Sequence, residues 1–171
     1  MENVLETAQT VLRATPVYWT TLAGSAPADL LKRAPAEGEW SALECLLHMI
    51  DFEGQGVPER IQAFLEGQNF PVYPPGRLSA AGESQSPQAA AEEFARLRKA
   101  NLERLAQVTP ADMARKSIHA RLGEVSFDEM MHQWAAHDLN HTIQAQRAII
   151  QPFIAGCGPW QGFFASQVIN A

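Results

Sequence analysis

The feature that most constrains the fold of this sequence is a long segment from Ser126 to about Gln151. It opens with a capping box, in which the Ser126 oxygen accepts from the backbone N–H of Glu129 and the Glu129 side chain reaches back to the backbone N–H of Ser126. Apolar residues then recur at helical spacing over a wide arc, until Pro152 is expected to end the helix. Roughly 24 residues at 1.5 Å each give a helix of about 36 Å. Because other helices must cover so wide an apolar arc, the segment predicts the central helix of an all-α domain.

Two further helices are predicted in the first part of the chain. One covers about 3–22, and Pro16 is expected to kink or break it, because proline has no N–H to donate. The other begins at a second capping box, formed by Ser41 and Glu44. Alanine, the best helix former, is the commonest residue of the chain, which favours the same fold class.

Segments rich in glycine, proline and serine are predicted to connect the helices. The second helix is expected to fray at Gly54 and Gly56, before a helical piece over 59–65. Residues 67–86 are rich in proline, glycine and serine and predict a long loop between the second and third helices. The third helix begins with Ser86 as N-cap and Pro87 as its first residue.

The last third of the chain contains two less regular segments. Residues 114–125 predict a short hairpin or an irregular crossing. The tail, 152–171, carries Phe153, Trp160, Phe163 and Phe164, and is expected to dock on the bundle or on a partner. The whole chain, 1–171, is therefore interpreted as a single helical domain.

Composition excludes several classes of function. The net charge is −6, and basic residues form no block, which argues against nucleic-acid binding. No apolar run exceeds three residues, and the sequence starts with acidic residues and no apolar stretch, so neither a membrane span nor a signal peptide is expected. Cys45 and Cys157 form no CxxC pair and are interpreted as reduced thiols of a cytoplasmic protein, with a disulfide between them as the alternative.

His137 and His141 are the first candidates for a functional site. They stand four residues apart on the predicted central helix, so their side chains share one face, about 40° apart. Two imidazoles at this spacing can reach one metal ion, or they can form a hydrogen-bonded pair on a half-buried face. Either a cation or hydrogen-bond partners must offset the cost of burying them. His132 lies on the opposite side of the helix and is interpreted as a surface or interface residue.

His48 is the third candidate. On a helical wheel it lies outside the main apolar stripe of its helix, so periodicity allows a second packed face through His48 but does not require one. Asp51 follows three residues later and is interpreted as a solvated carboxylate, although it could accept from a ligand histidine or serve as a further ligand.

Two motifs resemble one known family. Residues 40–53, WSALECLLHMIDFE, look like the "WS…E…H…D.E" signature of DinB-like proteins, and residues 137–144, HDLNHTIQ, look like their second signature, "HDxxHxxQ". The two motifs occur in the right order and at the right separation. The Pro16 break, the approach to Trp40 and Gly123 ahead of the last helix also resemble the family, and the likeness covers about 4–150.

The resemblance implies a four-helix bundle of DinB/YfiT-like type, in which three histidines from two helices hold a divalent metal. On this chain those ligands are His48, His137 and His141. It also implies a homodimer. Some relatives are thiol-dependent S-transferases or isomerases that work with low-molecular-weight thiols, and this activity belongs to subfamilies and not to the fold.

The expected function is that of a divalent-metal-dependent enzyme acting on a small molecule, either a thiol-dependent S-transferase or a hydrolase. Three neutral imidazoles leave coordination positions open, where a water or a thiol ionises more readily. Zn, Ni, Fe and Mn all suit such a site. Asp51, Glu44 and Gln144 are only weak candidates for a general base. The alternatives are a non-catalytic, metal-binding dimeric bundle that serves as a stress or binding module, and histidines that are merely buried and hydrogen-bonded.

Overall fold

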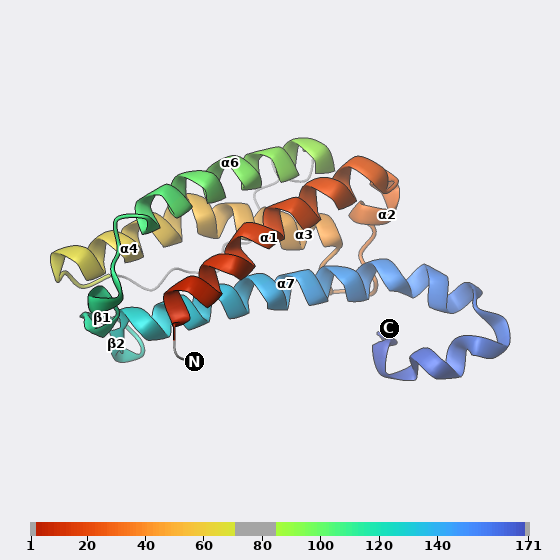
Figure 1. Cartoon of the computed structure of the whole chain (residues 1–171). Helices are drawn as coiled ribbons and strands as arrows, with labels where there is room; N and C mark the ends of the chain where they lie inside the picture. Colours follow the sequence, from red (N-terminus) through yellow and green to blue (C-terminus); the bar gives the residue numbers. More distant parts are fainter. Residues whose placement is uncertain (1–2, 71–84, 170–171) are drawn as a thin grey trace.

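The computed structural model describes residues 3–70 and 85–169, and over these ranges the long helices form a four-helix bundle (Figure 1). Helices α1 and α3 each pack against both α6 and α7. Helices α1 and α7 run in one direction, whereas α3, α4 and α6 run in the other (Figure 1). The predicted fold class is therefore confirmed. The bounds are α1 Val4–Ser25, α3 Ala42–Asp51, α4 Val57–Glu66, α6 Pro87–Leu105 and α7 Phe127–Gly156.

Short elements connect these helices. Strands β1 and β2 form an antiparallel hairpin in which Lys116 lies opposite Ser126 and His119 opposite Gly123, so the hairpin alternative is the correct one. Gly123 has a φ of 79°, a left-handed conformation that glycine adopts without strain. No helix in the described part of the chain is long and apolar enough to cross a membrane. The short elements are α2 Ala28–Lys32, η2 Pro110–Ala114, β1 Lys116–His119, β2 Gly123–Ser126 and η3 Gly158–Gln167.

The predicted caps of three helices are present. Ser41 N donates to Glu44 at 2.7 Å, and Glu44 N donates to the Ser41 hydroxyl at 3.2 Å. The same reciprocal pair joins Ser126 and Glu129 at the start of α7. Ser86 accepts from the backbone of Ala89 at the start of α6. These caps satisfy backbone N–H groups that have no partner inside the helix.

Of the kink or break expected at Pro16, the break does not occur, and a side chain from another helix compensates for the proline. Helix α1 runs continuously from Val4 to Ser25. Pro16 cannot donate to the carbonyl oxygen of Leu12, four residues earlier. The buried guanidinium of Arg98, on α6, donates to this oxygen at 2.9 Å instead.

The fraying expected at Gly54 and Gly56 is also wrong. Residues Phe52–Gly56 form a π-helical segment, η1, that joins α3 to α4 without a gap. The wider turn places Glu53 in the interior, where it is 1% exposed.

The end of α7 lies beyond the predicted stop. The helix passes through Pro152 and ends at Gly156. A proline inside a helix removes one backbone hydrogen bond, and here the next turn carries Ile154, which is buried. Burial beyond the proline thus favours continuation of the helix.

The predicted loop over 67–86 can be followed only at its ends. Gly67, with a φ of 66°, ends α4, and Pro87 begins α6. Residues 71–84 lie outside the described part of the chain, so the long loop stays a prediction.

The tail returns toward α7 and forms η3 (Figure 1). The Gln151 side chain donates to the Gln167 carbonyl at 2.9 Å and accepts from the Ile169 backbone at 3.1 Å. Trp160 and Phe163 are 62% and 82% exposed, so these two side chains are not packed into this bundle, whereas Phe164 is half-buried. Docking of the tail on a partner, and the interpretation of the chain as one domain, stay predictions.

Candidate metal centre

The structure brings the three predicted histidines together. His48 lies on α3, and His137 and His141 lie one turn apart on the neighbouring helix α7. One ring nitrogen from each residue lies within 4.8 Å of the other two. We call these three residues the histidine triad.

Gln144 orients His141. The side-chain oxygen of Gln144 lies 3.0 Å from His141 Nδ1. Because an amide oxygen only accepts, Nδ1 carries the proton and donates it, which leaves the lone pair of Nε2 for another partner. Metal-binding histidines commonly have such an acceptor on their second nitrogen.

The other two rings face each other. His48 Nε2 and His137 Nε2 are 3.1 Å apart, whereas both Nδ1 atoms are buried without a partner. Two nitrogens bound at 2.0–2.1 Å to one tetrahedral zinc ion lie roughly 3.3 Å apart. A shared proton could join two of these nitrogens, but a cation can join all three. The donor set of the triad therefore fits a divalent metal.

Burial keeps the triad neutral. Desolvation, reinforced by the neighbouring imidazoles, lowers the pKa of His48 to about 4 and that of His137 to about 3. Burial also lowers the pKa of His141. At neutral pH the rings are thus unprotonated, which is the state that a metal requires.

Aromatic side chains enclose the triad on two sides. The Trp40 ring stacks on His141 at 5.8 Å between centroids, with 18° between the planes, and also contacts His48 at 5.1 Å. The Phe52 ring lies 4.5 Å from His137. These rings limit the access of water to the nitrogens.

A buried charged cluster, formed by Glu53, Arg98 and Asp138, adjoins the triad. Arg98 donates twice to Asp138, at 2.7 and 2.8 Å, and once to Glu53 at 2.7 Å. All three side chains are 1% exposed. Two carboxylates against one guanidinium leave one negative charge, and Asp138 is the residue next to His137.

Neutral donors complete the charged cluster. Asn101 donates to one Glu53 oxygen and Trp134 donates to the other, at 2.9 and 2.8 Å. Thr15 donates to Asp138 at 2.5 Å. The cluster thereby joins α1, η1, α6 and α7 beside the triad, and every carboxylate in it is hydrogen-bonded.

Other residues that the sequence singled out lie outside the triad. Glu44 is part of its capping box, and Asp51 accepts from Gln55 at 2.9 Å. His132 is 48% exposed and faces Asp128. Glu44 and Asp51 both have other hydrogen-bond partners, so neither stands out as a general base.

Both cysteines are free, as predicted. Cys45 is buried, and desolvation raises the pKa of its thiol to about 12. Its thiol is therefore protonated at neutral pH and is not a nucleophile.

Sequence reasoning missed Trp40 as a wall of the site and missed the charged cluster. Glu53 and Asp138 both stand inside the two family-like motifs, although no role was assigned to them. Arg98 lies four residues after Phe94 and three before Asn101, on the buried face of α6. A charged residue on a buried stripe was the available signal, because it requires a partner of opposite charge.

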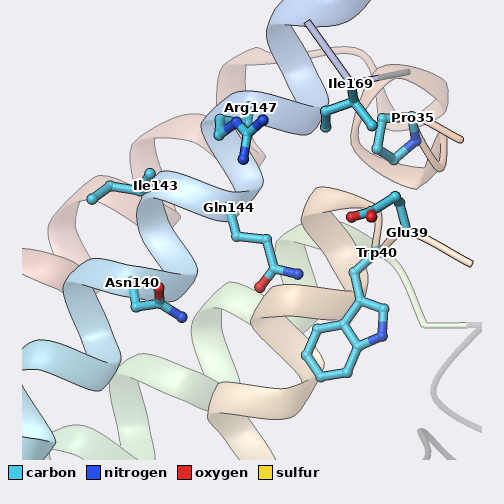
Figure 2. A pocket seen from close by; sticks show the side chains of 8 residues that line it. All are labelled: Pro35, Glu39, Trp40, Asn140, Ile143, Gln144, Arg147 and Ile169. Atoms are coloured by element: carbon cyan, nitrogen blue, oxygen red, sulfur yellow. The ribbon is translucent and has the colours of Figure 1, made fainter. Parts of the chain in front are cut away.

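A cavity of about 320 Å³ lies between α7 and the segment before α3 (Figure 2). Trp40 and Gln144, which both contact His141, line it together with residues of α7 and of the segment before α3. A small molecule in this cavity would contact Trp40 and Gln144, the two lining residues that contact His141.

Comparison with known proteins places the chain in a family. The model of the DinB superfamily matches residues 12–145. A solved structure with a similar fold is that of YfiT from Bacillus subtilis, described as a probable metal-dependent hydrolase with an unusual four-helix bundle topology. It has a TM-score of 0.75 and 13% sequence identity, with 87% of each chain covered. Among curated proteins, no match is found. The chain belongs to the DinB superfamily.

Proposed function

We propose that this protein is a divalent-metal-dependent enzyme in which His48, His137 and His141 hold the ion. The observation that carries the proposal is the convergence of three neutral imidazoles, from two helices, within 4.8 Å. Zn, Ni, Fe and Mn are the candidate ions, because imidazole binds all of them. The description of YfiT as a metal-dependent hydrolase supports the same class of function.

Three protein ligands make this a catalytic type of site. A metal with three histidine ligands keeps a coordination position open, where it lowers the pKa of a water or a thiol toward neutrality. The chain itself contributes the orientation of His141 through Gln144, and the exclusion of bulk water by Trp40 and Phe52. The reaction that fits is a hydrolysis or the transfer of a thiol to a small substrate bound in the adjacent cavity.

Metal content tests the ligand set. Protein without a His tag is loaded with Zn²⁺, freed of excess ion, and analysed for bound metal. We expect about one ion per chain in the wild type and none in a His137→Ala/His141→Ala variant. His132→Ala, which changes an exposed histidine of the same helix, is the matched control and should bind metal like the wild type. Circular dichroism verifies that the variants are folded. Equally little metal in all three proteins would contradict the proposal.

Cobalt spectroscopy separates an enzyme from a structural metal site. In Co²⁺-substituted protein, 2-mercaptoethanol is expected to change the visible spectrum, because an open position accepts the thiol. In a non-catalytic, metal-binding bundle, the metal would raise the melting temperature but the spectrum would not respond to the thiol. The second result would favour the binding-module alternative.

A further inference from the structure

The cavity beside the triad shares two of its walls with the candidate metal centre. Trp40 stacks on His141, and Gln144 accepts from His141 Nδ1; both line the cavity (Figure 2). Its volume of about 320 Å³ suits a small molecule. A ligand in this cavity would therefore contact two residues that themselves contact His141.

Two opposite charges line the same cavity. Glu39 precedes α3 and Arg147 lies on α7, and both line the cavity together with Gln144 (Figure 2). Both side chains are exposed, and the ion pairs of the described residues include neither of them. Each charge thus remains available to a ligand.

Gln144 adds a donor to the same cavity. Because its oxygen is held by His141, its NH₂ group is free to donate elsewhere, and Figure 2 shows the amide nitrogen on the side of Trp40. Ile143 and Ile169 complete the lining with apolar surface. The cavity therefore combines a cation, an anion and an amide donor around an aromatic wall.

We infer that the cavity binds a small zwitterion, whose carboxylate contacts Arg147 and whose ammonium group contacts Glu39. An arginine can bind a carboxylate through two parallel N–H groups, and a ligand of only one sign would meet an unfavourable charge on one side. That the ligand's reacting end faces the triad rests on the proposed function. The two charge contacts do not depend on a metal.

Matched dipeptides test the charge requirement. Cysteinylglycine carries both charges, N-acetylcysteinylglycine lacks the ammonium group, and cysteinylglycine amide lacks the carboxylate. Binding is followed through the indole N–H resonance of Trp40 in ¹⁵N-labelled protein, assigned with a Trp40→Phe variant among the four tryptophans. We expect the zwitterion to bind about fivefold or more tightly than either analogue. Equal binding of all three, or no shift of the Trp40 resonance, would overturn the inference.

Charge-removing variants assign each contact. Arg147→Gln should weaken cysteinylglycine about fivefold and leave cysteinylglycine amide unaffected, whereas Glu39→Gln should weaken cysteinylglycine and leave the N-acetyl analogue unaffected. The controls are Arg121→Gln and Glu103→Gln, which remove exposed charges away from the cavity. Variants and controls with the same effect would contradict the assigned contacts.

A thiol-free probe separates this inference from the proposed function. Alanylglycine is titrated into metal-free protein, and cysteinylglycine into the Co²⁺ form. If alanylglycine binds with the charge preference above but the thiol leaves the cobalt spectrum unchanged, the zwitterion site stands and the metal-dependent activity fails. If the thiol changes the spectrum but charge removal has no effect, the proposed function stands and the zwitterion site fails.

Discussion

At the scale of single residues, Arg98 holds three buried groups together through its hydrogen bonds to Leu12, Glu53 and Asp138. It neutralises much of the charge of Glu53 and Asp138, and it satisfies the Leu12 carbonyl that Pro16 leaves without a donor. A buried carboxylate without its partner is strongly destabilising, because the interior cannot solvate it.

Arg98→Met is therefore expected to lower the free energy of unfolding by about 3–5 kcal/mol, as measured by urea denaturation. Arg96→Met is the control, because Arg96 pairs with Glu93 on the exposed face of the same helix, where an ion pair contributes little. Equal losses in the two variants would show that the charged cluster does not depend on Arg98.

Gln144 is expected to act through His141. Gln144→Leu removes the acceptor that fixes the tautomer of His141, so the affinity for Zn²⁺ should fall about 10- to 100-fold. Competition with a chelating dye measures the affinity. Gln88→Leu, at the start of α6, is the control and should bind like the wild type. An unchanged affinity in the Gln144 variant would mean that His141 is oriented by other contacts.

At the scale of elements, the π-helical segment η1 explains how one helix serves two functions. It keeps α3 and α4 continuous, and it turns Glu53 into the interior toward Arg98 and Trp134. His48 lies in the last turns of α3, before η1 begins. The triad and the charged cluster thus each receive one residue, His48 and Glu53, from adjacent turns of one continuous element.

Glycine substitutions test whether this segment is helical. A Cβ at Gly54 would meet only Leu97 Cδ1, at an ordinary 3.8 Å, so Gly54→Ala should raise the free energy of unfolding by about 0.5–1 kcal/mol. Gly123→Ala should lower it by about 1–2 kcal/mol, because Gly123 has a φ of 79°. Thermal or urea denaturation gives both signs. A destabilising Gly54→Ala would mean that the segment frays in solution.

At the scale of the whole molecule, the triad couples folding to pH. Burial lowers the pKa values of His48 and His137 to about 4 and 3, below the 6.5 of an unfolded chain. Below pH 6.5 the unfolded state therefore binds more protons than the folded state. The contribution of these two unprotonated histidines to the stability of the metal-free protein is fully present above pH 6.5. It is lost as the pH drops toward 4.

Urea denaturation of chelator-treated protein between pH 7.5 and 5 measures this dependence. The expected slope is about 1.4 kcal/mol per pH unit for each proton taken up on unfolding. His137→Gln should reduce the slope by about one proton. A slope that is the same in the wild type and in this variant would show that His137 does not take up a proton on unfolding.

The fold class and most helix starts could be predicted from local patterns of residues. Capping boxes at Ser41 and Ser126, and the N-cap at Ser86, are local interactions between residues three apart, so they can be recognised without a structure. The spacing of His137 and His141 is also local, because one helix holds both. The resemblance to DinB-like proteins, and not periodicity, added His48 to them.

Features that depend on contacts between helices could not be predicted from local patterns. Whether Pro16 breaks α1 depends on Arg98, 82 positions further along the chain, and whether Pro152 ends α7 depends on packing beyond it. The distance between His48 and His137, the wall formed by Trp40 and the pairing of Glu53 and Asp138 with one guanidinium are likewise long-range. Local patterns specify helices and their ends, whereas the pairing of buried charges and the meeting of distant rings are set by how the helices pack.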